Sequence, residues 1–444
     1  MTFISFAAVA LGVIIVTSLF VSDLRAKIAV FLGTLGLTYC GLHLFGGHIG
    51  HEVLHEVFMV DYVQFIPIPV STVLIAALGL FAVNPSKETK LGWFLWFICP
   101  IAGNFGTTWA LVPVGLSLMP TLKRLYPDRW LMILITVCAF SMNFMALGTL
   151  AADPPQAYWA VKVSESGSPL GFFFPVTQFW LYMSFTMALY ACVLKRLGVE
   201  FGGFTDLIDL LRSVHVGKAL FGTAIAATVG LSITFLQGYM VTWVLGTTCV
   251  VVGICGFVFF GHEEQHRTIH WSLETATIFL AFFSVVALAH RGLHDIQIGN
   301  QGMVGAVIAL TLGADNAAAF AAAYPQFAAL GRMYLVWFNL FPAVTFGGLS
   351  PLGNGPQIAL FLVILVSMNE VTSKQVFVTW FREACVFAPY LLFWAIGIST
   401  VIEWGQTPTV AVQILIGMLG LLSASESMDL QGKYRKLMES NEGN

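Results

Sequence analysis

Residues 347–357 read GGLSPLGNGPQ and interrupt an otherwise apolar run that extends from residue 333 to residue 367. Glycine and proline weaken an α-helix by about 1 and 3 kcal/mol per residue relative to alanine, so a regular helix is not expected to continue through this stretch. Inside a membrane, the interrupted backbone would expose N–H and C=O groups that lipid cannot hydrogen-bond. The stretch therefore predicts a broken helix that is surrounded by protein or by a water-filled cavity.

A second interruption of the same kind occurs in the first half of the chain. Residues 148–156 read GTLAADPPQ within the apolar run 130–163, and both interruptions end in Pro-Gln. We refer to 148–156 as the first break and to 347–357 as the second break. Each follows another interrupted apolar run: 91–120, with IAGN at 101–104, and 301–330, with GADN at 313–316. Such pairs point to an internal repeat with a transport site, although glycine and proline can also kink helices for packing alone.

The composition is that of a membrane protein. Of the 444 residues, 58% are hydrophobic and 10% are charged, against about 45–50% and about 25% in soluble domains. This excludes an ordinary soluble enzyme, and a net charge of −3 gives no sign of a nucleic-acid partner. The seven cysteines form no Cys-x-x-Cys pair and are expected to be reduced. The first apolar run, 2–21, is expected to be a retained span because no basic segment precedes it.

The distribution of positive charge predicts the topology. We assume that the N-terminus faces out and that runs 91–120 and 301–330 are re-entrant hairpins. Only three of the 20 lysines and arginines then lie outside, namely Lys162, Arg291 and Arg332. If both runs crossed the membrane, this cytoplasmic excess would almost disappear, contrary to the positive-inside rule. The hairpins then open from opposite sides, so the two halves of the chain are inverted and the C-terminus is cytoplasmic.

The predicted fold is an all-α polytopic membrane protein with about 11 spanning helices and two re-entrant hairpins, in two inverted-topology repeats with discontinuous helices. The segments are as follows: N-terminal spans and an outer His/Glu-rich segment at 1–64; a first repeat at 65–194, with its hairpin at 91–120 and its broken helix at 130–163; an amphipathic cytoplasmic linker at 195–218; a second repeat at 219–424, with its hairpin at 301–330 and its broken helix at 333–367; and a cytoplasmic tail at 425–444.

Two acids lie within the interrupted segments. The residues immediately before Asp153 and Asp315 include no Lys or Arg that could neutralise either carboxylate. Apolar surroundings disfavour the charged form of a carboxylic acid, so such a group can exchange a proton for a metal cation near physiological pH. Ionisable residues inside a membrane are functional by default. For Asp153, which directly precedes two prolines, a role as a helix cap is an equal alternative.

These motifs resemble a bacterial family of sodium/proton antiporters. That family is similar to a wider superfamily of sodium/proton antiporters, arsenite permeases and carriers of citrate or dicarboxylates. The resemblance covers about residues 90–370 and rests on GTLAADPP at 148–155, TLGADNAA at 311–318 and GGLSPLGNGP at 347–356. It implies an inverted-repeat fold, often dimeric, whose hairpin tips move as a transport domain. The chain departs from the family at 106–109, GTTW, where members often carry an acid, and it lacks the Ser-Asn-Thr signature of the dicarboxylate branch.

The resemblance and the breaks together give a candidate ion-binding set. Asp315 is expected to alternate between a proton and a cation, while Asn316 and Asn354 supply oxygen ligands. The full set is Asp315, Asn316, Asn354, Asn104, Thr107, Thr149, Asp153 and Ser350. The expected function is exchange of Na⁺ or another monovalent cation for H⁺ across the bacterial inner membrane. The expected partners are the lipid bilayer, small inorganic ions and a second copy of the chain, with no further cofactor.

Two other functions are weighed against antiport. A carrier of anions or carboxylates with the same fold would hold its substrate at half-helix N-termini. A membrane metalloprotease is suggested by HEVLH at 51–55 and HEEQH at 262–266, since two histidines four residues apart on a helix can bind zinc. His48, His51 and His55 are weak metal-ligand candidates. Both stretches lie at predicted water boundaries, where such clusters are usually only solvated.

Overall fold

The computed structural model describes mainly residues 88–106, 111–149, 173–235, 300–313, 345–351 and 371–442, with shorter pieces and single residues elsewhere. Every regular element in these ranges is a helix, so the all-helical class is confirmed for the described part of the chain. Within that part, three helical segments are long and apolar enough to cross a membrane: α11 (Phe174–Arg196), α20 (Ser373–Glu403) and Val410–Lys433 of α21 (Val410–Glu442). The total of about 11 spans, the two hairpins and the inverted repeats stay predictions.

The first interrupted run contains two helical arms. The arm that begins with α5 (Glu88–Trp93) passes through a π-helical segment, η2 (Phe94–Ile98), and ends with α6 (Cys99–Gly106). The second arm, α7 (Leu111–Leu125), continues beyond residue 120, where the apolar run was expected to end.

The first broken helix follows α7. It begins with α8 (Trp130–Ile135), continues as a π-helix, η4 (Thr136–Met142), and ends with α9 (Asn143–Met145). Residues 146–149 then form turns and bends, so the α-helix stops just before Gly148. π-Helical segments are rare and often occur at functional sites.

The corresponding pieces of the second half are α16 (Asn300–Gly313) and a 3-10 helix, η6 (Thr345–Leu349). All residues of η6 are buried. The second break therefore begins in a tight turn inside the protein rather than at its surface.

Helix α20 holds the described helices together. It begins with a capping box, in which the Thr372 hydroxyl accepts from the Gln375 backbone N–H at 3.3 Å. Its buried aromatic side chains contact two neighbours: the Phe387 ring lies 4.9 Å from that of Phe140 in η4, and the Tyr390 hydroxyl donates to the Tyr182 carbonyl of α11 at 3.0 Å. The first broken helix and α11 are thus packed against a long apolar helix.

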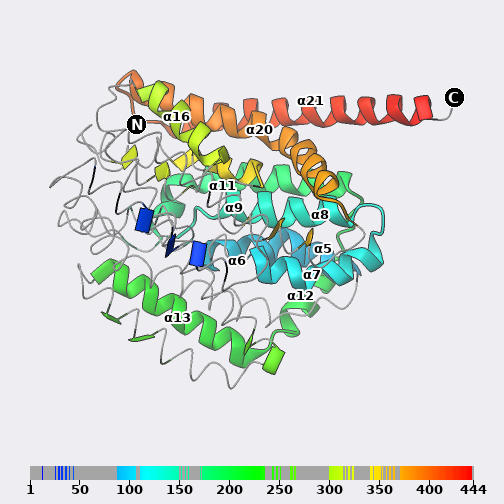
Figure 1. The fold of residues 1–444 in the computed structure, drawn as a ribbon, viewed down its shortest axis with the longest axis horizontal. Coiled ribbons are helices and arrows are strands. Elements are labelled where there is room, and N and C mark those ends of the chain that lie inside the picture. Colours follow the sequence, from blue (N-terminus) through cyan, green and yellow to red (C-terminus); the bar gives the residue numbers. More distant parts are fainter. Residues whose placement is uncertain are drawn as a thin grey trace.

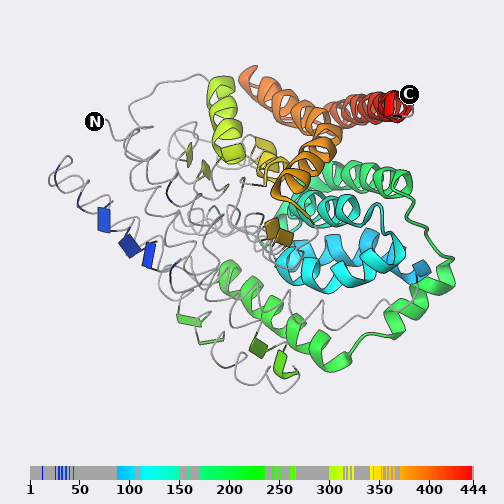
Figure 2. The same ribbon diagram turned by 45° about the vertical axis from the view of Figure 1, so that its right-hand side comes forward.

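Two other helices lie on the opposite side of the molecule. In both views, α13 (Val216–Phe235) lies across the group α5–α9 from α20 and α21 (Figures 1 and 2). The short helix α12 (Phe204–Arg212) precedes it within the predicted linker. Phe204 and Leu211 are exposed while Leu210 is buried, as expected of a helix that lies at a membrane surface.

Helix α21 extends through most of the segment 425–444 that the sequence set apart as a tail. It runs to Glu442 and projects beyond the body of the molecule (Figure 1). Gln431 lies within this extension and connects it to two other helices: its amide nitrogen donates to the Arg382 carbonyl at 2.5 Å, and its amide oxygen accepts from Arg196 Nη2 at 2.8 Å. The first turns of the tail are therefore part of the packed structure.

Candidate functional site

The first break is held by Asn104, which α6 carries near its C-terminal end. The Asn104 side-chain oxygen accepts a hydrogen bond from the Gly148 backbone N–H at 2.6 Å, and its amide nitrogen donates to the Pro100 carbonyl at 3.0 Å. The Thr149 hydroxyl donates to the Asn104 backbone carbonyl at 2.5 Å. The structure thus brings together two residues of the candidate set, Asn104 and Thr149, and both are buried. Because the Asn104 amide is already bonded on both sides, its first role is to position the break.

Glycine is needed at two contacts between α6 and the first broken helix with its break. A β-carbon on Gly148 would lie 2.4 Å from the Asn104 side-chain oxygen, and one on Gly103 would lie 2.9 Å from the Met142 carbonyl. Both distances are shorter than van der Waals contact. The small residues in IAGN and GTLAADPPQ therefore allow α6 to approach the end of the broken helix.

The second break is closed by a buried glutamine. The Gln357 amide nitrogen, assigned to the side that faces two acceptors, donates to the Gly347 carbonyl at 2.6 Å and to the Ser350 carbonyl at 2.7 Å. The Ser350 backbone N–H also donates to the Gly347 carbonyl, at 3.3 Å. Ser350, a member of the candidate set, is thereby buried inside the turn that ends η6.

The first break is closed by a glutamine in the same way. In the first break, the Gln156 amide nitrogen donates at 2.7 Å to the carbonyl of Ala146, ten residues earlier. Gln357 makes the same contact with Gly347, which also lies ten residues earlier. Both glutamines are fully buried. The matched Pro-Gln ends of the two sequence motifs therefore close two turns in the same way.

Asn316 lies against the second break, as Asn104 lies against the first. A β-carbon on Gly347 would lie 3.5 Å from the Asn316 β-carbon and 3.5 Å from the Thr311 carbonyl. Asn316 is 2% exposed. Both asparagines that the sequence placed at the interrupted runs are thus buried beside a glycine of a break.

The second break meets the end of the first broken helix at Asn143, a residue that the sequence analysis missed. A β-carbon on Gly348 would lie 2.6 Å from Asn143 Nδ2 and 2.7 Å from the Phe144 ring. The indole N–H of Trp380 in α20 donates to the Gly348 carbonyl at 3.3 Å. The end of the first broken helix therefore contacts the second break directly. The only sequence signal for Asn143 was a single amide in an apolar run, five residues before Gly148.

A second missed residue, Glu383, lies on α20. Its carboxylate is fully buried and lies 3.9 Å from Arg196 Nη2 at the end of α11 and 3.3 Å from Arg382 Nε. Its other oxygen, Oε2, has no hydrogen-bond partner in the described part of the chain. Gln431 accepts from the Arg196 side chain and donates to the Arg382 backbone carbonyl, so this cluster joins α11, α20 and α21.

The remaining candidates lie outside the described residues. These are Asp315, Asn354, Thr107, Asp153, His48, His51 and His55. Of the other histidine motif, His262, Glu263 and His266 are exposed. Among the residues that the structure describes, no group of three His, Cys, Asp or Glu side chains could hold a metal ion.

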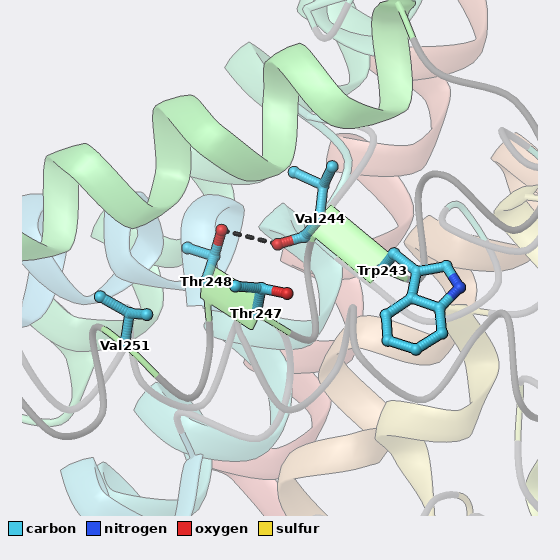
Figure 3. Close-up of a pocket in the computed structure, with 5 residues that line it drawn as sticks. All are labelled: Trp243, Val244, Thr247, Thr248 and Val251. Atoms are coloured by element: carbon cyan, nitrogen blue, oxygen red, sulfur yellow. Dashed lines mark hydrogen bonds between the residues drawn. The ribbon is translucent and has the colours of Figure 1, made fainter.

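The described part also contains a surface depression of about 440 Å³ whose lining includes no residue of either break. Figure 3 shows its lining residues: Trp243, Val244, Thr247, Thr248 and Val251. The Thr248 hydroxyl donates to the Val244 carbonyl at 2.7 Å and is not available to a ligand through that proton (Figure 3). No charged side chain is among these lining residues, so this depression is a poor candidate for an ion site.

The buried contact between the end of the first broken helix and the second break remains the candidate functional site. Comparison with known proteins adds no name to it: no known protein-family model matches the chain, and no curated protein matches it.

Proposed function

We propose that this chain is a secondary active transporter that exchanges a monovalent cation, with Na⁺ as the first candidate, for protons by alternating access. One observation carries the proposal. Two glycine- and proline-rich breaks are each closed by a glutamine bound to a carbonyl ten residues earlier, and the second break contacts the end of the broken helix that leads into the first break. Discontinuous helices of this kind supply free carbonyls and half-helix ends that bind ions near the middle of the membrane.

In this mechanism Asp315 carries either a proton or the cation, which couples the two movements. Asn316, Asn354 and Ser350 supply oxygens in the second half of the site. Asn104, Thr107 and Thr149 form the matching first half, and Asp153 is a second carboxylate or a helix cap. Movement of the two interrupted runs against the outer helices would expose the site to either side in turn.

The location follows from the same proposal. The chain resides in the bacterial inner membrane with its N-terminus outside and its C-terminus in the cytoplasm, and it works as a homodimer. Helices that are apolar enough to span a membrane support the membrane location.

The test is cation-induced proton movement in everted membrane vesicles. Addition of Na⁺, Li⁺ or K⁺ should collapse an imposed proton gradient with the wild-type chain and should have no effect with Asp315→Asn. Asp209→Asn is the matched control, because Asp209 lies on the exposed face of α12 and contacts only Arg212 among the described ion pairs, at 4.0 Å. A wild-type chain that gives no signal with any of these cations would overturn the antiport proposal, and Asp315→Asn with wild-type activity would overturn the role of Asp315.

A further inference from the structure

Asn143, the first residue of α9, carries a buried amide. It is 2% exposed, and neither its oxygen nor its nitrogen has a hydrogen-bond partner in the described part of the chain. An unpaired polar group buried in this way costs about 1–3 kcal/mol, so buried amides are nearly always bonded in folded proteins. Asn143 also directly follows the π-helix η4, a type of segment that is frequent at functional sites.

Its position is central to the candidate site. The preceding residue, Met142, is packed against Gly103 of α6, next to Asn104. The Asn143 amide nitrogen lies against Gly348 of the second break, and rotation of the amide by 180° places its oxygen there instead. A ligand at this amide would therefore contact both halves of the proposed site.

The surroundings favour a cation over an anion. The sequence from residue 130 to 161 contains no Lys or Arg, while it includes Asp153. The part of the second break that meets Asn143 also carries backbone carbonyls: Gly348 O, which accepts from Trp380, and Gly347 O of the preceding residue, which accepts from Gln357. A carbonyl oxygen has two lone pairs, so Gly348 O retains acceptor capacity, whereas Gly347 O already accepts from both Gln357 and the Ser350 N–H. Oxygen atoms of amides and carbonyls are the ligands that hard cations prefer.

We propose that Asn143 is a ligand of the transported cation, and that its amide oxygen binds the ion where the end of the first broken helix meets the second break. This inference rests on the proposed function and adds to it a residue that joins the two halves of the site. The neutral amide supplies a dipole, and the charge that balances the ion comes from a carboxylate. Ion binding supplies the partner that this amide lacks among the described residues.

The test uses the full chain, purified in detergent, and the leucine variant Asn143→Leu. Leucine has the same branched shape as asparagine, with two methyl groups in place of the amide oxygen and nitrogen, so a purely structural role predicts an unchanged or higher melting temperature without ions. The readout is the melting temperature measured in increasing Na⁺, with choline as the balancing cation. The wild-type chain should be stabilised by Na⁺. Asn143→Leu should melt near the wild-type temperature in choline and require at least tenfold more Na⁺ for the same stabilisation.

Two further variants complete the experiment. Gln413→Met is the matched control. Gln413 is also buried, and its amide oxygen has no hydrogen-bond partner among the described residues, but it lies near the start of α21 and its nitrogen donates to the Pro408 carbonyl. The Gln413→Met variant should keep wild-type Na⁺ dependence. Asn143→Ser replaces the leucine variant if the latter does not fold, and it should show the same loss because its shorter side chain cannot reach the ion. Wild-type Na⁺ dependence in the Asn143 variant would overturn this inference alone. A wild-type chain with neither Na⁺ stabilisation nor antiport would overturn the proposed function itself.

Discussion

At Gly148, the lack of a β-carbon decides the local structure. Its backbone N–H donates to the Asn104 side-chain oxygen at 2.6 Å, and a β-carbon on Gly148 would lie 2.4 Å from that same oxygen. The Asn104 amide cannot move away easily, because its nitrogen is bonded to the Pro100 carbonyl within its own helix. Substitution at Gly148 must therefore separate α6 from the first break or shift the break itself.

We expect Gly148→Ala to lower the free energy of unfolding by about 1–3 kcal/mol, the usual cost of overpacking, and to reduce transport more strongly than stability. The measurement is thermal unfolding in detergent together with proton movement in vesicles. Gly305→Ala on α16 is the control, since no heavy atom lies within 4 Å of an added β-carbon there. It should leave transport unchanged and stabilise the helix by up to about 1 kcal/mol. Equal behaviour of the two variants would contradict the close contact described at Gly148.

At the scale of elements, the cluster around Glu383 connects three helices. Arg196 ends α11, Arg382 and Glu383 lie on α20, and Gln431 lies on the extension of α21. Glu383 is fully buried, whereas the side chains of Arg196 and Arg382 are 29% and 44% exposed. The arginines can thus remain partly hydrated, but the carboxylate depends on them for its charge.

Arg196→Ala should destabilise the chain by about 1–3 kcal/mol, because it removes one of two positive partners from a buried carboxylate. Addition of Glu383→Gln should recover part of that loss, since the buried charge is then absent. A double-mutant cycle of thermal unfolding measures the coupling between the two residues. Strictly additive effects would contradict an ion pair between α11 and α20.

The whole molecule shows which features can be predicted from a sequence of this kind. Composition and apolar runs predicted an all-helical membrane protein, and the described helices agree in class. Glycine and proline patterns also identified the stretches near Gly148 and Gly347 where the described helices end or tighten. These signals are local, because they depend on what a short segment can form by itself.

Asn143, Glu383 and Gln431 could not be identified in this way. Their roles depend on partners that lie far away in the sequence: Gly348 for Asn143, Arg196 for Glu383, and both Arg196 and Arg382 for Gln431. A lone polar residue in an apolar run does not indicate which distant segment it will meet. The contact between the first broken helix and the second break likewise appears only when the helices are packed together.

The most direct test of the account is coupled ion movement by the purified chain in proteoliposomes. An imposed Na⁺ gradient should drive protons in the opposite direction, detected by a pH-sensitive dye inside the vesicles, while radiolabelled Na⁺ follows its own gradient. The Na⁺ concentration for half-maximal flux should increase as the pH falls, because protons compete with Na⁺ for the same carboxylate. Proton movement in the same direction as Na⁺, or none at all, would contradict cation/proton exchange at the two breaks.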